Sequence, residues 1–175
     1  ARRDLVQDLT TSREILESIT GSPVTGYRAP SFAVNNNVLD LISDAGYEYD
    51  SSYNSFSGHG RYGTLDLSAA EKKEAAWRVN GGFYELPVSN TRIGGKVIPL
   101  GGGGYFRLFP FPVFRQGIKS VLKDSNAFVF YAHPWEFDPD QPRVTQASKK
   151  FKFRHYINLN QTEHKLRRLI QTFSH

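Results

Sequence analysis

The 175-residue sequence lacks two amino acids altogether, because it contains no cysteine and no methionine. Without cysteine there is no disulfide framework, no thiol nucleophile and no cysteine-ligated zinc or iron–sulfur site. The missing methionine leaves no initiator residue, and the opening residues ARRDL are typical of a helix interior. We therefore expect a fragment or a processed chain.

Long apolar runs and a secretory leader are missing as well. No stretch approaches the ~18–20 apolar residues that are needed to span a bilayer. The first residues include Arg2, Arg3 and Asp4 in place of an apolar core. The sequence therefore predicts no membrane span, and it shows no signal peptide.

Self-contained metal and nucleotide motifs are also absent. The histidines form no His-x-x-x-His or His-x-x-Glu-His pair, and the glycine run 101–104 precedes neither Lys-Ser nor Lys-Thr. The sequence therefore offers no metal ligand set and no P-loop. We expect the glycines to let the backbone approach a ligand or to form a flexible loop.

Basic residues moderately outnumber acidic residues. Basic residues number 22 and acidic residues 17, which gives a net charge of +5 and a pI near 9.5. Such an excess favours polyanions, although scattered bases mainly aid solubility. The densest basic stretch, 149–156, interleaves cations with aromatic residues, as single-stranded nucleic-acid binders do. The same alternation is typical of a half-buried strand or loop, and we expect no nucleic-acid partner.

Apolar spacing predicts alternating helices and strands in the first part of the chain. We expect helices at 2–19 and 38–45 and strands at 24–28 and 47–51. Such alternation favours parallel α/β architecture, and we expect one domain over residues 1–175.

The rest of the chain is less regular. Residues 52–82 are predicted to form a long excursion, and loops of that length are usually functional. Segment 127–132 is apolar throughout, which predicts a strand buried on both faces. Asn160 and Glu163 predict a capping box that opens the last helix. The other expected elements are strands at 83–88 and 96–100 and a helix at 113–122.

Three polar residues stand at the carboxyl ends of expected strands, namely Arg28, Asp50 and His133. Reactive residues of parallel α/β folds collect at the carboxyl ends of strands. An aspartate near an imidazole would orient it and raise its pKa, and an arginine can position a second carboxylate. Each residue also has an ordinary explanation: a surface ion pair for Arg28, a turn for Asp50 and a packed ring for His133.

Three segments, in this order, resemble the later motifs of the polysaccharide deacetylase family (NodB homology, carbohydrate esterase 4). They are GYRAPSF at 26–32, GYEYDSS at 46–52 and YAHPWE at 131–136. The tail is similar to the subgroup found beside exosortase and exopolysaccharide loci, in GGGGYFRL at 101–108, HPWEFDPDQPR at 133–143 and RHYINL at 154–159. The resemblance covers essentially the whole chain.

The resemblance implies both a fold and a reaction. The fold is the C-terminal part of a distorted (β/α) barrel of the polysaccharide deacetylase type, with a family-specific tail at about 134–175. The reaction is metal-dependent hydrolysis of N-acetyl groups from an amino-sugar polysaccharide in bacterial exopolysaccharide biosynthesis. A catalytically inactive polysaccharide-binding homologue is the alternative. The compartment stays open between bacterial cytoplasm and periplasm.

The resemblance also implies a role for each matching residue. Arg28 would orient the catalytic-base aspartate, and the backbone N–H of Ser31 would face the developing oxyanion. Asp50 would tune His133, which would protonate the leaving amine. The residues expected to line the sugar groove are Tyr105, Arg107 and Trp135.

Two motifs of the family are absent from this sequence. Thr-Phe-Asp-Asp holds the base and one metal ligand, and His-(Ser/Thr)-x-x-His holds two further ligands; both normally precede the first helix seen here. The family uses a divalent metal, for which we expect Zn²⁺, but its ligands are not in this sequence. We also expect an open sheet edge, covered by a missing N-terminal segment or by a second copy in a homo-oligomer.

Overall fold

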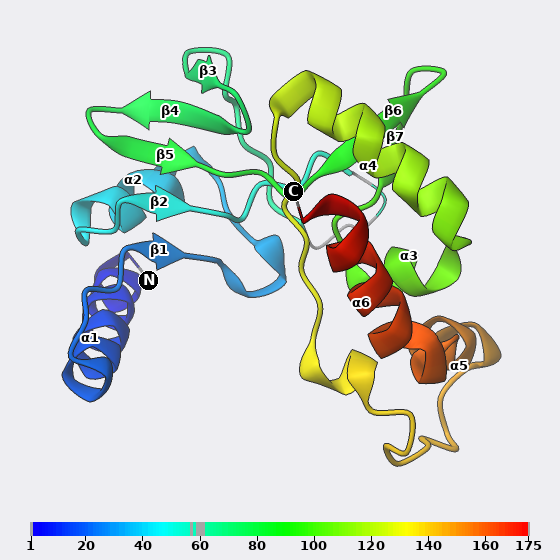
Figure 1. Ribbon diagram of the computed structural model, residues 1–175. Helices are drawn as coiled ribbons and strands as arrows, with labels where there is room; N and C mark the ends of the chain where they lie inside the picture. Colours follow the sequence, from blue (N-terminus) through cyan, green and yellow to red (C-terminus); the bar gives the residue numbers. More distant parts are fainter. Residues whose placement is uncertain (1, 57, 59–61, 175) are drawn as a thin grey trace. The chain divides into compact units, whose positions relative to one another are not determined.

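The computed structural model describes residues 2–56, 58 and 62–174. The chain forms two compact units, Ala1–Val88 and Ser89–His175. The N-terminal unit contains a five-stranded sheet, and the C-terminal unit contains a two-stranded hairpin (Figure 1). The expectation of a single domain stays a prediction.

The five-stranded sheet has the strand order β1-β2-β5-β4-β3. Its strands are β1 (Gly26–Tyr27), β2 (Tyr49–Asp50), β5 (Phe83–Glu85), β4 (Ala76–Asn80) and β3 (Glu71–Lys73). The first three are parallel, and the last two continue the sheet antiparallel. The α/β prediction is therefore confirmed. Over the described residues the sheet is open and closes into no barrel.

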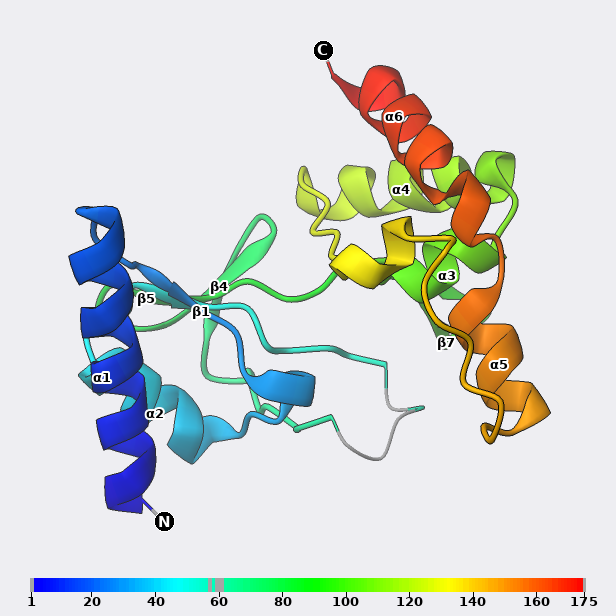
Figure 2. The same cartoon turned by 90° about the horizontal axis from the view of Figure 1, so that it is seen from below.

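Two helices complete the N-terminal unit, α1 (Arg2–Thr20) and α2 (Asn36–Asp44), which lie side by side next to the sheet (Figure 2). Both were expected within two residues of these bounds. The Asn35 side chain begins α2 by accepting a hydrogen bond from the Val38 N–H. Leu9 is completely buried, and its carbonyl accepts a 3.1 Å hydrogen bond from the Tyr47 hydroxyl. This contact fixes α1 on the unit's core.

The C-terminal unit is built from a hairpin and four α-helices in its described part. They are β6 (Asn90–Ile93), β7 (Lys96–Pro99), α3 (Gly103–Leu108), α4 (Phe111–Ser125), α5 (Lys149–Tyr156) and α6 (Thr162–Phe173). Phe106 of α3, Phe114 of α4 and Leu169 of α6 share one buried cluster. None of the helices in the described residues is long and apolar enough to cross a membrane.

Three strands, β3, β4 and β6, were not among the expected elements. The excursion expected at 52–82 contains β3 and β4, and the three residues of β3 are all charged and exposed. Strand β6 was also missed, although Gly94 and Gly95, both with positive φ, join it to β7. A Gly-Gly pair between two extended runs is a hairpin signal.

The prediction of a doubly buried strand at 127–132 is wrong. Only Tyr131 forms a bridge, with Gly102, and the side chains from Phe128 to Ala132 are half-buried. The backbone hydrogen bonds of Val129 and Tyr131 point to one side, toward Ser89 and the glycine run. The described residues thus supply neighbours along one edge of this segment only, which leaves its apolar side chains partly exposed.

Two local expectations for the tail are also wrong. The basic stretch 149–156 is α5, a helix begun by the Ser148 side chain, and not a strand or loop. The last helix is present as α6, but residue Gln161 precedes it without a side-chain cap, so the expected capping box is not formed. A short 3₁₀ turn, Leu159–Gln161, occupies that position.

Candidate functional site

Two buried carboxyl groups stand side by side at the carboxyl ends of parallel strands. Asp50 ends β2 and is paired in register with Glu85, which ends β5, and neither is exposed. Asp50 Oδ1 accepts a 2.8 Å hydrogen bond from the Ser52 hydroxyl, and Oδ2 accepts a 3.0 Å bond from the Ser52 N–H. Both oxygens of Asp50 are thereby held by one neighbour.

The Glu85 carboxyl group is buried beside Asp50 and has few hydrogen-bond partners. Its Oε1 accepts a 2.9 Å hydrogen bond from the Tyr53 N–H, and its Oε2 is buried without a hydrogen-bond partner among the described residues. Burial, and then the adjacent Asp50 carboxylate, raise the pKa of Glu85 to about 9. A pKa this far above the usual value keeps Glu85 mostly protonated at pH 7.

Arg28 lies just after β1 and is tied to the same corner of the sheet. Its Nε donates a 2.7 Å hydrogen bond to the Ser51 carbonyl, and its terminal nitrogen donates a 2.6 Å bond to the Ser51 hydroxyl. The next backbone N–H, of Ala29, donates to the Ser52 hydroxyl at 2.7 Å. Ser51 and Ser52 thus connect Arg28 with the buried Asp50.

Ser31 sits in a strained turn of the same unit. Ser31 and Phe32 both have positive φ, 55° and 56°. Each such non-glycine conformation costs on the order of 1–3 kcal/mol and is found mostly where surrounding structure enforces it. The Phe32 ring is buried and packs edge-on against Tyr62, with the Arg28 guanidinium 5.7 Å from its centroid. The packed ring holds the Ser31 backbone in place.

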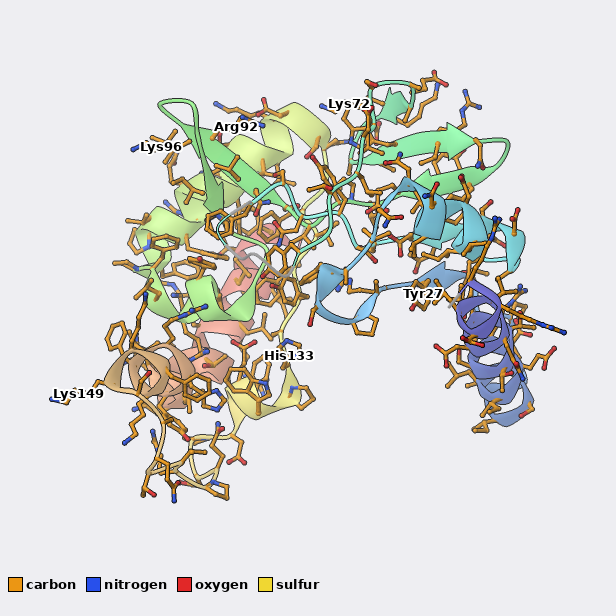
Figure 3. The ribbon with its side chains drawn as sticks, turned by 180° about the vertical axis from the view of Figure 1, so that it is seen from behind. Tyr27, Lys72, Arg92, Lys96, His133 and Lys149 are labelled. Carbon is orange, nitrogen blue, oxygen red and sulfur yellow. The ribbon has the colours of Figure 1, made fainter. Side chains whose placement is uncertain are left out.

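His133 lies in the C-terminal unit with an exposed side chain (Figure 3). Its backbone N–H donates a 3.1 Å hydrogen bond to Glu136 Oε1. Its ring is stacked with that of Trp135, with the centroids 6.0 Å apart. Trp135 in turn stacks on His155 at 4.1 Å, and burial lowers the pKa of His155.

Arg107 and Glu136 form a buried ion pair below this stack. Arg107 Nε donates to Glu136 Oε2 at 2.9 Å, and both side chains are almost completely buried. The Arg107 guanidinium also donates to the carbonyls of His155 and Ile157 at 2.9 and 2.8 Å. It lies 5.2 Å from the Trp135 ring centroid. These contacts give Arg107 a bracing role, and its expected part in a sugar groove stays a prediction.

The remaining expected site residues divide between the two units. Arg28, Ser31 and Asp50 come together in the N-terminal unit, around Ser51 and Ser52. In the C-terminal unit, Arg107, His133 and Trp135 gather around Glu136, while Tyr105 is half-buried and stacks on Phe109. Their expected roles stay predictions.

Sequence reasoning missed Glu85 and Glu136. A usable signal existed for Glu85, because the period of two in a strand places it on the same face as the buried Phe83. Within the described part of the chain, no three His, Asp or Glu side chains gather as a metal site would require.

Comparison with known proteins places most of the chain in one family. Residues 51–175 match the family model described as Domain of unknown function (DUF3473). No curated protein and no solved structure matches the chain. Since the match extends over well more than half of the 175 residues, the chain belongs to the DUF3473 family.

Proposed function

We propose that this chain forms the acid and substrate side of a metal-dependent polysaccharide N-deacetylase, folded as the C-terminal part of a distorted (β/α) barrel. One observation carries the proposal: Arg28 and Asp50 meet at the carboxyl ends of parallel β1 and β2, joined through Ser51 and Ser52. That edge is where parallel α/β folds hold reactive groups. The motif resemblance around these residues supports the same reaction.

In this proposal Arg28 is a positioning residue. Ser51 fixes one edge of its guanidinium through two hydrogen bonds, while the side chain as a whole is exposed. A guanidinium held in this way is suited to orient a carboxylate in bidentate fashion. The carboxylate would be the general base that removes a proton from the attacking water.

Ser31 and His133 serve the two later events of the reaction. The backbone N–H of Ser31 stabilises the oxyanion, and the strain of its turn supports such a fixed role. His133 protonates the leaving amine, so that the C–N bond breaks to release acetate and a free amino sugar. Its exposed ring and the hydrogen bond from its N–H to Glu136 fit a side chain that meets a polymer.

The described residues contain no set of side chains that could bind the metal. No three candidate ligands converge, and the family's Thr-Phe-Asp-Asp and His-(Ser/Thr)-x-x-His motifs are not in the sequence. These residues do not fit a metal centre, so no step of the reaction is derived through one. The alternative function is that of a catalytically inactive homologue that only binds polysaccharide.

A deacetylation assay on the whole natural protein tests the proposal. Acetate release from N-acetylated glucosamine oligomers is measured with and without a chelator, for wild type, His133→Ala and the matched control His164→Ala, an exposed histidine of α6. We expect the chelator to abolish turnover, and His133→Ala to lower kcat by about 10²–10⁴-fold. Turnover that resists the chelator, or survives unchanged in His133→Ala, contradicts the proposal. Binding of the oligomers without any turnover supports the inactive homologue.

A further inference from the structure

The C-terminal unit carries a basic stretch that the proposed reaction does not use. Its five cations, with no acidic residue between positions 143 and 156, are Arg143, Lys149, Lys150, Lys152 and Arg154. Over the described residues, none of the five forms an ion pair. This stretch therefore carries local positive charge that no ion pair within the described residues neutralises.

Two of these cations line a groove between α5 and the loop that precedes it. Arg143, Lys152, Phe153 and Tyr156 are among its walls, and its volume is about 460 Å³. Small-molecule sites commonly have volumes of about 300–1,000 Å³. Phe153 is 60% exposed, so its ring offers an apolar surface beside the two charges.

The walls of the groove are fixed by internal contacts. The Tyr156 hydroxyl accepts a 2.9 Å hydrogen bond from the Val144 N–H, and Lys152 Nζ donates a 2.8 Å bond to the Thr145 carbonyl. The Arg143 guanidinium lies 4.2 Å from the centroid of the Tyr156 ring. Because these contacts hold both cations before any ligand arrives, less freedom is lost on binding.

The arrangement of the aromatic rings disfavours nucleic acid and membrane as partners. Successive bases of a single strand stack on neighbouring rings, but Phe151 and Phe153 are two residues apart on a helix and diverge by about 200°. Phe151 stacks on His155, while Phe153 lines the groove. The cations alternate with these rings around α5, so the helix has no continuous apolar face to enter a lipid surface.

We propose that this groove, named here the α5 groove, binds an anionic polysaccharide through a carboxylate-bearing sugar unit. The planar fork of Arg143 matches a carboxylate, Lys152 adds a second positive charge, and Phe153 covers the apolar face of the sugar. The inference rests on the proposed function, because it narrows the deacetylase's polymer to one that contains uronate units.

The ligand side of the test uses one sugar in two charge states. The 175-residue chain is titrated by calorimetry with a galacturonate oligosaccharide and with its methyl ester, which keeps the rings but removes the charge. We expect the ester to bind at least about 10-fold more weakly, since a charge-assisted hydrogen bond contributes about 1.5–3 kcal/mol. Affinity for the acid should also fall as salt is added.

The protein side uses matched neutralisations in the same unit. Arg143→Gln and Lys152→Gln should each raise the Kd for galacturonate by about 10-fold. The control pair Arg92→Gln and Lys96→Gln removes the same charges from the exposed β6–β7 hairpin, at a distance from α5 (Figure 3), and should change the Kd by less than about twofold.

Three outcomes overturn the inference: equal affinity for acid and ester, equal losses in the groove and control variants, or tighter binding of oligothymidylate or phosphatidylserine vesicles. None of these measurements depends on turnover. Uronate binding without deacetylation would contradict the proposed function and support the α5 groove as a binding site. Deacetylation without uronate binding would support the proposed function and contradict the groove proposal.

Discussion

The raised pKa of Glu85 should make the stability of the N-terminal unit depend on pH in a direction opposite to that of most carboxyl groups. The pKa of Glu85 is raised from 4.5 to about 9 in the folded chain. Between these values the folded state binds a proton that the unfolded state has released. The stabilisation is therefore complete below about pH 4.5 and is lost as the pH rises toward 9.

The magnitude follows from one bound proton. Within this window each pH unit changes the free energy of unfolding by about 1.4 kcal/mol. Raising the pH from 6 to 8 should thus lower the free energy of unfolding by about 3 kcal/mol, which is a large part of the total of about 5–15 kcal/mol that is typical of a domain. The full burial of Glu85 keeps solvent from screening this effect.

The variant Glu85→Gln isolates the contribution of Glu85 ionisation to the free energy of unfolding, because an amide has nearly the size of the protonated acid but cannot ionise. Urea unfolding is followed at pH 6 and pH 8 through Trp77 of β4, with Trp135→Phe as background to silence the other tryptophan. We expect Glu85→Gln to have a much smaller change between the two pH values, and to be more stable than wild type at pH 8.

Glu48→Gln is the matched control, since Glu48 is exposed beside β2 and its replacement should keep the wild-type slope. The reasoning is refuted if wild type and Glu85→Gln lose the same free energy between pH 6 and pH 8, because the buried pair would then hold no extra proton.

Three further predictions concern packing and caps. Arg107→Met leaves Glu136 charged and buried, so urea unfolding followed by Trp135 fluorescence should show a loss of about 3–5 kcal/mol; Arg107→Met with Glu136→Met should recover much of it, and a loss below about 1 kcal/mol contradicts the ion-pair assignment. Gly103→Ala places a Cβ in steric conflict with both Glu136 carboxylate oxygens and should lower the melting temperature, whereas Gly104→Ala meets nothing within 4 Å and should not. Asn35→Ala removes the α2 cap and should cost about 1 kcal/mol in chemical denaturation; no change would show that the 3.0 Å bond to Val38 is not stabilising.

The parts of the fold that were predictable are those whose signals are local. Helices α1 and α2 follow from apolar spacing, and their alternation with β1 and β2 indicates parallel pairing. Strand β3 carries no such signal, because its residues are all exposed. The ion pair of Glu71 with Arg78 of β4 joins it to the sheet, and that contact is visible only after folding.

The candidate site shows the same division between local and distant information. A strand that ends at Asp50 or just before Arg28 can be recognised in sequence, because only the order of residues is needed. The neutrality of Glu85 depends on its register with Asp50, 35 positions earlier in the chain, and on complete burial. The sequence offered one sign of this buried carboxyl group, because Glu85 lies on the same face of the expected strand as the apolar residue Phe83.

The three tail segments GGGGYFRL, HPWE and RHYINL contact one another in the folded chain, which gives them a structural role independent of any reaction. Arg107 of GGGGYFRL pairs with Glu136 of the HPWE segment, and its guanidinium donates to carbonyls of the RHYINL segment. Gly103, in the same glycine run, leaves the space that the Glu136 carboxylate occupies. Three motifs distant in sequence therefore meet at one buried ion pair.

That convergence has a consequence for His133. Glu136 accepts a hydrogen bond from Arg107 through Oε2 and another from the His133 backbone N–H through Oε1. Arg107 and the candidate acid His133 are therefore connected through one side chain. A change at Arg107 should consequently alter the orientation of the His133 ring without touching a substrate. Arg107 then acts as a positioning residue, whose replacement should shift the histidine's NMR resonances along with the stability of the unit.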